Sequence, residues 1–352
     1  MEKAAVDEQG LIIPLVDLSK FLNGDAAQRK ETAGAILNGF QTAGFIYLKG
    51  LPIAPSTRKH VFDTSAKFFN GLTQDEKLAL GWTTPEANRG YSEPGREKVT
   101  QLTDINEVAR LKAGNPDIKE SFEIGRESDL EYPNQWPVEE AGTAVEGFRK
   151  TMLGFFEQCQ SIHVEVMRAV ALGMGLDDGY FDGFTDDGDN TLRLLHYPAV
   201  KSEVFKINPG QVRAGSHSDY GSITLLFQDD AGGLQVMSPS GSFVGAAPIE
   251  DTCVVNAGDL LARWSNDTIK STIHRVVEPR RKTEEHPARY SIAVGLTYAS
   301  IKLTGDLDSY FCNPNFNKNI EAIPGTYATE ADKKYEGINC GQYLVQRLAA
   351  TY

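Results

Sequence analysis

The second half of the chain is divided into short β-rich runs separated by turn residues, and this pattern restricts the fold more than any other feature. The runs cover residues 192–197, 222–227, 234–237, 254–256, 272–277 and 290–294. Turn-forming stretches lie between them, for example residues 229–233, which read Asp-Asp-Ala-Gly-Gly. Many short strands at this spacing predict a β-sandwich or a jelly roll.

The first half has a different pattern, in which apolar residues recur at helical spacing. Three segments show it, at residues 33–40, 61–69 and 148–167, and each predicts a helix. Short strands are predicted at residues 11–17 and 44–48, and the polar stretch 83–126 is predicted to be a long lid or loop. We therefore predict a mainly β protein with flanking helices. Residues 1–190 would form an N-terminal region of helices and strands, and residues 191–352 a jelly-roll (double-stranded β-helix) core, together one catalytic unit.

Composition excludes several classes of protein. The 352 residues are 41% hydrophobic, which is enough for a large core, and Lys+Arg of 35 against Asp+Glu of 48 gives a net charge of −13. That charge would repel a nucleic-acid backbone, although a free nucleobase carries no phosphate and is not excluded. The four cysteines lack metal-ligand spacing, so neither a zinc site nor a disulfide framework is indicated. Because the N-terminus is too polar for a signal peptide and no apolar run is long enough to span a membrane, we predict a cytoplasmic protein.

Three residues suggest a metal site. His217 and Asp219 are two positions apart, so on an extended strand both side chains would leave the same face, and His274 lies in a later β-branched run. Two imidazoles and one carboxylate form the facial triad of non-haem iron oxygenases, which leaves coordination positions open. An HxD tripeptide alone is a weak signal, and a lone strand histidine is more often a core or surface residue.

Arg289 and Ser291 strengthen this interpretation. They are again two positions apart on a predicted strand, so a guanidinium and a hydroxyl would share one face. A planar guanidinium with a flanking donor suits the distal carboxylate of a dicarboxylate such as 2-oxoglutarate. An isolated pair of this kind is more often a surface arginine on an edge strand. In order after HxD and the distant histidine, it indicates a co-substrate site.

With these motifs the chain resembles the Fe(II)/2-oxoglutarate dioxygenases of the isopenicillin N synthase-like group, over nearly its whole length. Residues 13–17, 44–48 and 192–198 look like the corresponding segments of that family. The resemblance implies Fe(II), 2-oxoglutarate as co-substrate and O2. It also implies that His217, Asp219 and His274 are the iron ligands, and that Arg289, Ser291 and Tyr197 bind the far carboxylate of 2-oxoglutarate.

Four segments, at residues 82–91, 217–222, 262–267 and 346–352, are similar to the branch of this family that hydroxylates the methyl group of the free base thymine. This implies a pyrimidine base as the small-molecule substrate, with Arg193, Tyr220 and Phe311 around it; Tyr220 and Phe311 could equally be core residues. Two alternatives remain: the same chemistry on a secondary metabolite, or a catalytically silent binding protein. We expect no nucleic-acid, membrane or obligate protein partner.

The chain departs from the family pattern at one place. After Ala293 the family continues directly into the segment found here at Tyr310–Asn315, so that residues 294–309 intervene. These residues are either a genuine loop or translated intron sequence. If Ala293 were joined to Tyr310, strand alternation would place Phe311 on the same face as Arg289 and Ser291.

Overall fold

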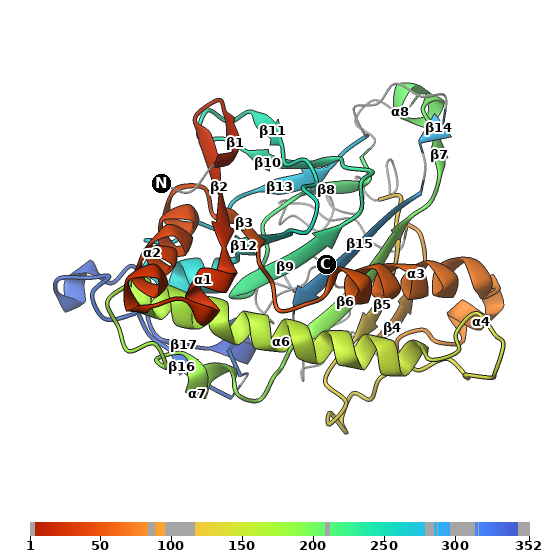
Figure 1. Cartoon of the computed structure of the whole chain (residues 1–352), viewed down its shortest axis with the longest axis horizontal. Coiled ribbons are helices and arrows are strands. Elements are labelled where there is room, and N and C mark those ends of the chain that lie inside the picture. The colour runs from red at the N-terminus through yellow and green to blue at the C-terminus, as the bar shows by residue number, and fades with distance from the viewer. Residues whose placement is uncertain are drawn as a thin grey trace.

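Two facing sheets of a jelly roll, with helices packed on the outer face of the larger sheet, form the framework of the protein (Figure 1). The computed structural model describes residues 4–83, 89–95, 117–207, 212–278, 285–286, 288–295, 314–315 and 317–343. The predicted mainly β fold with a jelly-roll core is confirmed. The division into two regions at residue 190 stays a prediction, and the N-terminal strands join the same sheet as strands from the second half.

The larger sheet has nine strands in the described part of the chain, in the order β1-β2-β3-β12-β9-β15-β6-β5-β4. In that order the strands are Ala4–Glu8, Leu11–Asp17, Phe45–Lys49, Cys253–Ala257, Ile223–Gln228, Arg289–Gly295, Thr191–Tyr197, Glu120–Ile124 and Gly90–Ser92.

The smaller sheet has the order β11-β10-β13-β8, and two short two-stranded ribbons accompany it. Its strands are Phe243–Gly245, Leu234–Met237, His274–Val276 and Ala214–His217. The ribbons pair β14 (Glu285–His286) with β7 (Val200–Lys201), and β16 (Asn319–Ile320) with β17 (Ile338–Asn339). Each of the six runs predicted in the second half overlaps a strand: β6, β9, β10, β12, β13 or β15.

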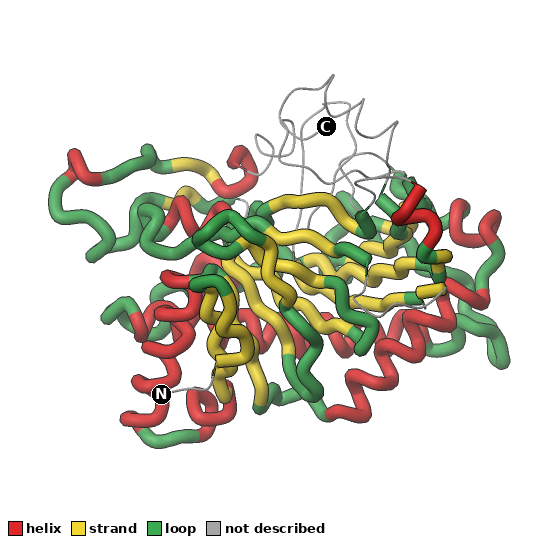
Figure 2. The backbone as a smooth tube through the Cα atoms, turned by 90° about the horizontal axis from the view of Figure 1, so that it is seen from above, coloured by secondary structure: helices red, strands yellow, loops and turns green. Residues whose placement is uncertain are grey.

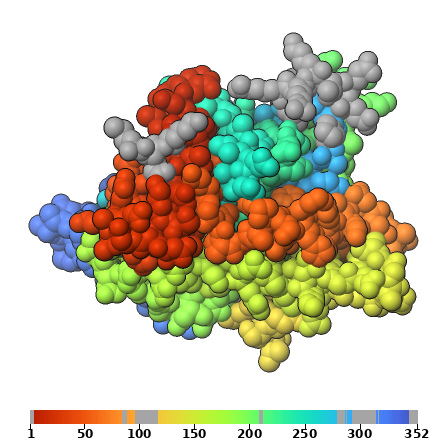
Figure 3. Space-filling view, viewed as in Figure 1, coloured from red at the N-terminus to blue at the C-terminus, as the bar shows by residue number. Residues whose placement is uncertain are grey.

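The predicted helices are also present. The described helices are α1 (Leu18–Asn23), α2 (Ala26–Thr42), α3 (Pro55–Gly71), α4 (Gln74–Leu78), α6 (Phe148–Gly173), α7 (Asp182–Thr185), α8 (Glu203–Ile207), α9 (Asp259–Trp264) and the 3-10 turn Glu330–Asp332. In the space-filling view α6, in yellow-green, runs along the lower edge beneath α2 and α3, and both helices contact it (Figure 3). None of the described helices combines the length and the apolar character needed to cross a bilayer.

Local sequence explains how the chain enters this arrangement. Strands β2 and β3 pair in parallel, so a crossover must connect them, and α1 and α2 form it. Asp25 caps α2 by accepting a hydrogen bond from the backbone amide of Gln28, while the Gln28 side chain accepts one from the Asp25 amide. The crossover therefore begins at a defined residue and returns the chain to the same sheet.

Side-chain alternation divides the interior into two cores. On β6, Leu192 and Leu194 belong to the core between the larger sheet and the helices, whereas Leu195 and Tyr197 belong to the core between the two sheets. Figure 2 shows the strands side by side in the middle of the molecule with helices around them. The side chains that face the smaller sheet are the ones available to a site between the sheets.

The stretch predicted to be a long loop contains strands β4 and β5, so that prediction is wrong over these residues. All of β5 is buried, although it includes Glu120 and Glu123. Each carboxylate has a buried cation: Lys77 Nζ lies 2.9 Å from Glu120, and Arg193 Nε lies 2.8 Å from Glu123. A buried carboxylate needs a paired cation, and here both cations come from other elements of the chain. The polar sequence of this stretch by itself therefore indicated a loop.

Candidate active site

The side chains predicted to bind a metal lie together between the two sheets. His217 ends β8 and His274 begins β13, and these residues are direct cross-strand partners in an antiparallel pair. Asp219 lies just beyond β8 rather than on it, yet its Oδ1 is 3.7 Å from Nε2 of His217 and 3.5 Å from Nε2 of His274. One ligand atom from each residue lies within 4.8 Å of the others. This donor set fits a single divalent iron ion with three protein ligands on one face.

Backbone contacts prepare both imidazoles for this role. Nδ1 of His217 is 2.8 Å from the Gly215 carbonyl, and Nδ1 of His274 is 3.2 Å from the Thr272 carbonyl. Because a carbonyl can only accept, each Nδ1 carries the proton, and each Nε2 presents a lone pair toward Asp219. Burial lowers the pKa of His217 well below its usual range, and the neighbouring His274 and the charges of Lys119 and Arg193 lower it further. The neutral, metal-binding form is therefore favoured.

Two further residues hold the carboxylate of Asp219. Its Oδ2 accepts hydrogen bonds from Thr224 Oγ1 and from Asn256 Nδ2, both at 2.6 Å. With Oδ2 occupied, Oδ1 remains directed at the two histidines. Neither Thr224 nor Asn256 is recognisable from the sequence, because they lie on β9 and β12 and become neighbours only through strand pairing.

We expect Asn256→Ala and Thr224→Val each to weaken iron binding about 10- to 100-fold, because the carboxylate loses the contact that fixes its orientation. Iron affinity measured by anaerobic titration checks this. Asn319→Ala, at an exposed position on β16, is the matched control. Unchanged iron affinity in both Asn256→Ala and Thr224→Val would contradict the orienting role.

The three residues predicted to bind the co-substrate also face this space. Arg289 and Ser291 lie on β15, and the register pairs Arg289 with Tyr197 on β6. The guanidinium of Arg289 lies 4.9 Å from the Tyr197 ring centroid, and its Nη1 donates to Ser291 Oγ at 3.2 Å. Arg289 is 1% exposed, and its Nε has no hydrogen-bond partner among the described residues. A buried guanidinium with an unsatisfied donor suits an anionic carboxylate ligand.

Each of the three residues predicted to surround the substrate has a different outcome. Arg193 lines the same cavity, but its guanidinium is held by Glu123 at 2.8 Å and by Ser121 Oγ at 2.9 Å. Tyr220 is buried, at 2% exposed, and is not one of the described residues that line this cavity. Phe311 lies outside the described residues, as do residues 296–309 of the possible insertion. Residues 294–295 continue β15.

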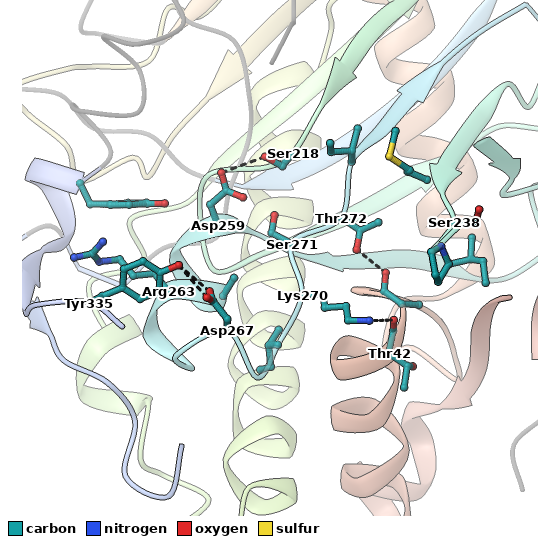
Figure 4. Close-up of a pocket in the computed structure, with 18 residues that line it drawn as sticks. Thr42, Ser218, Ser238, Asp259, Arg263, Asp267, Lys270, Ser271, Thr272 and Tyr335 are labelled. Carbon is teal, nitrogen blue, oxygen red and sulfur yellow. Dashed lines mark hydrogen bonds between the residues drawn. The ribbon is translucent and has the colours of Figure 1, made fainter. Parts of the chain in front are cut away.

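Two cavities are lined by residues of the segment from His217 to Asp219. The smaller, of about 80 Å³, is lined by all three candidate ligands together with Lys119, Arg193, Tyr197, Arg289 and Ser291. The larger, of about 810 Å³, contains none of the ligands and is shown in Figure 4, where Ser218 donates to Asp259 at one wall and Tyr335 to Asp267 at another. The chemistry belongs to the smaller cavity, because only that one is lined by the ligand atoms.

Comparison with known proteins agrees with this geometry. Residues 13–139 match the family described as non-haem dioxygenase in morphine synthesis N-terminal, and residues 188–297 match the 2OG-Fe(II) oxygenase superfamily. The chain belongs to the 2-oxoglutarate-Fe(II) oxygenases. It is a dioxygenase that uses Fe(II), 2-oxoglutarate and O2.

Particular relatives differ in what they act on. The solved structure of full-length thymine 7-hydroxylase from Neurospora crassa, in complex with alpha-KG and thymine, is 66% identical, covers 99% of this chain and 100% of that chain, and has a TM-score of 0.89. The 2-oxoglutarate-Fe(II) type oxidoreductase ppzD of Metarhizium rileyi is 32% identical over 96% of this chain and 90% of its own length. The proline hydroxylase buaE of Petromyces alliaceus is 32% identical over 96% of this chain and 98% of its own length.

Proposed function

We propose that this dioxygenase hydroxylates the methyl group of thymine, with succinate and CO2 as co-products. The observation that carries the proposal is the 66% identity, over essentially the whole chain, to a structure that holds thymine together with alpha-KG. The relatives ppzD and buaE are each 32% identical to this chain, which is about half that value.

In this proposal His217, Asp219 and His274 hold the iron, and Arg289, Ser291 and Tyr197 bind the distal carboxylate of 2-oxoglutarate. Bound iron and 2-oxoglutarate supply the oxidising chemistry, through activation of O2 and oxidative decarboxylation of the co-substrate. The protein positions the ligands and excludes bulk water. Thr224 and Asn256 orient Asp219, and the backbone carbonyls of Gly215 and Thr272 orient the imidazoles.

Arg193 has the best-supported role in substrate binding. It lines the ligand cavity, and its contacts with Glu123 and Ser121 fix the guanidinium, so it can donate to a pyrimidine carbonyl at a defined position. Tyr220 and Phe311 remain predictions as partners of the flat ring. No side chain is required as a general base, because the reaction removes hydrogen from carbon by oxidation.

We expect purified, iron-loaded protein to convert thymine to 5-hydroxymethyluracil with one succinate formed per product. Thymidine should be a poor substrate, because the buried Arg193, held by Glu123 and Ser121, leaves no room for the sugar beside it. Chromatographic detection of the product, with succinate quantified in parallel, checks both statements. Succinate formation without thymine gives the uncoupled baseline.

A second candidate function is oxidation of a secondary metabolite, which the similarity to fungal secondary-metabolite dioxygenases favours. A panel containing free bases, amino acids including proline, and other small metabolites separates the two. If only a compound other than a pyrimidine stimulates succinate formation, the thymine proposal is wrong. If no compound raises decarboxylation above background, the substrate lies outside the panel.

A further inference from the structure

Glu123 is a fully buried carboxylate that pairs with Arg193. It lies on β5, is 0% exposed, and is the direct cross-strand partner of Arg193 on β6. Its Oε1 lies 2.8 Å from Nε of Arg193. Arg193 lines the cavity of the candidate iron ligands, whereas Glu123 is not among the described residues that line it. The carboxylate is therefore placed to influence a ligand in this cavity through the arginine.

Two further contacts define the geometry of this ion pair. The indole Nε1 of Trp82 donates to Glu123 Oε2 at 3.2 Å, so each carboxylate oxygen has a different partner. Arg193 Nη2 donates to Ser121 Oγ at 2.9 Å, and Ser121 shares one face of β5 with Glu123. A rotation of the Glu123 carboxylate would weaken both of its contacts. The series of contacts thus runs from Trp82, in the segment after α4, through Glu123 to the cavity wall at Arg193.

The position of the Arg193 guanidinium matters because the cavity contains a second carboxylate. Asp219, one of the candidate iron ligands, lines the same cavity, and Arg193 is close enough to His217 to influence it electrostatically. An arginine side chain is long and flexible, so the guanidinium adopts a single position only where its partners hold it. The ion pair with Glu123 keeps the guanidinium at β5, where it cannot compete with iron for Asp219.

Resting on the proposed function, we propose that Glu123 and Trp82 are positioning residues for substrate binding: they hold the Arg193 guanidinium where thymine meets the cavity wall, and neither touches the base. Substrate affinity then depends on a carboxylate and an indole that lie behind the wall. Without them the guanidinium moves toward Asp219, and thymine loses a defined surface to bind. The co-substrate is affected little, because its predicted partner Arg289 lies on β15 rather than on β5 or β6.

Equilibrium binding tests this proposal. Protein loaded anaerobically with Fe(II) is titrated by calorimetry with 2-oxoglutarate and then with thymine. We expect Glu123→Gln, which keeps the shape and removes the charge, to raise the Kd of thymine roughly tenfold, and Trp82→Phe, which removes one neutral donor, roughly threefold. The Kd of 2-oxoglutarate should stay within about twofold in both. Asp129→Asn is the matched control: Asp129 is a buried carboxylate 4.0 Å from another buried arginine, Arg89, and neither is among the described residues that line the cavity.

A double-mutant cycle separates positioning from a merely structural role. In an Arg193→Gln background, Glu123→Gln should change the Kd of thymine less than about twofold, because the guanidinium that it positions is gone. A full further loss in that background overturns the inference, and so does an equal loss of thymine affinity in Asp129→Asn. Trp82→Phe keeps both charges, so an unchanged thymine Kd there overturns the inference even if melting temperatures show that Glu123→Gln does not fold. Wild type that binds no thymine overturns the proposed function as well.

Discussion

Replacing His217, Asp219 or His274 with alanine is expected to reduce substrate-dependent succinate formation to background in each case. Each side chain presents one ligand atom to the common centre, where the three atoms lie within 4.8 Å of one another. Removal of one leaves a two-ligand site that neither retains iron well nor keeps its open positions on one face. Iron content after gel filtration and succinate formation under saturating 2-oxoglutarate are the two measurements.

His60→Ala is the matched control, because His60 is an exposed histidine on α3 far from the site. It should retain both iron and activity. Asp219→Ala differs from the histidine variants in one respect: a small exogenous anion can occupy the space of the lost carboxylate, so partial rescue by formate or chloride is expected there alone. Full activity in any of the three ligand variants would refute the assignment of that residue.

The clustering of His217, Asp219 and His274 could be predicted from the sequence, because only one of the three depends on strand pairing to reach the others. HxD puts two donors close together in any extended conformation, and the separate histidine is brought to them by one antiparallel pair, β8 with β13. The predicted strand was too long, since β8 ends at His217 and Asp219 lies in the loop that follows. The pairing of Arg289 with Tyr197 could also be predicted, because each residue lies at one end of a strand that the sequence pattern indicates.

The residues that the sequence did not reveal act through contacts between distant segments. Thr224 and Asn256 look like ordinary strand residues until the pairing of β9 with β12 brings both to Asp219. Strand β5 could not be predicted for the same reason. Its sequence contains two carboxylates, and the cations that pair with them come from α4 and β6.

Arg289→Ala is expected to leave iron bound and to raise the 2-oxoglutarate concentration needed for half-maximal activity about tenfold to more than a hundredfold. The basis is the loss of charge-assisted hydrogen bonds of roughly 1.5–3 kcal/mol to the distal carboxylate, at about 1.4 kcal/mol per factor of ten. Arg289 is buried beside Tyr197 and Ser291, and neither of these side chains carries a positive charge that could replace it. Arg289→Lys should be intermediate, since it keeps the charge and loses the planar fork.

The decisive comparison uses 2-oxopentanoate, a 2-oxo acid with the same carbon chain but no distal carboxylate. Wild type should strongly prefer 2-oxoglutarate over this analogue, and Arg289→Ala should lose most of that preference, because the partner of the distal carboxylate is gone. A general weakening of the fold would affect the two acids equally and would also lower the melting temperature without either acid. If Arg289→Ala kept the full preference for 2-oxoglutarate, the distal carboxylate would have to bind elsewhere. The neighbouring Arg213, whose pKa is lowered by burial and by the charge of Arg289, would then be the next residue to test.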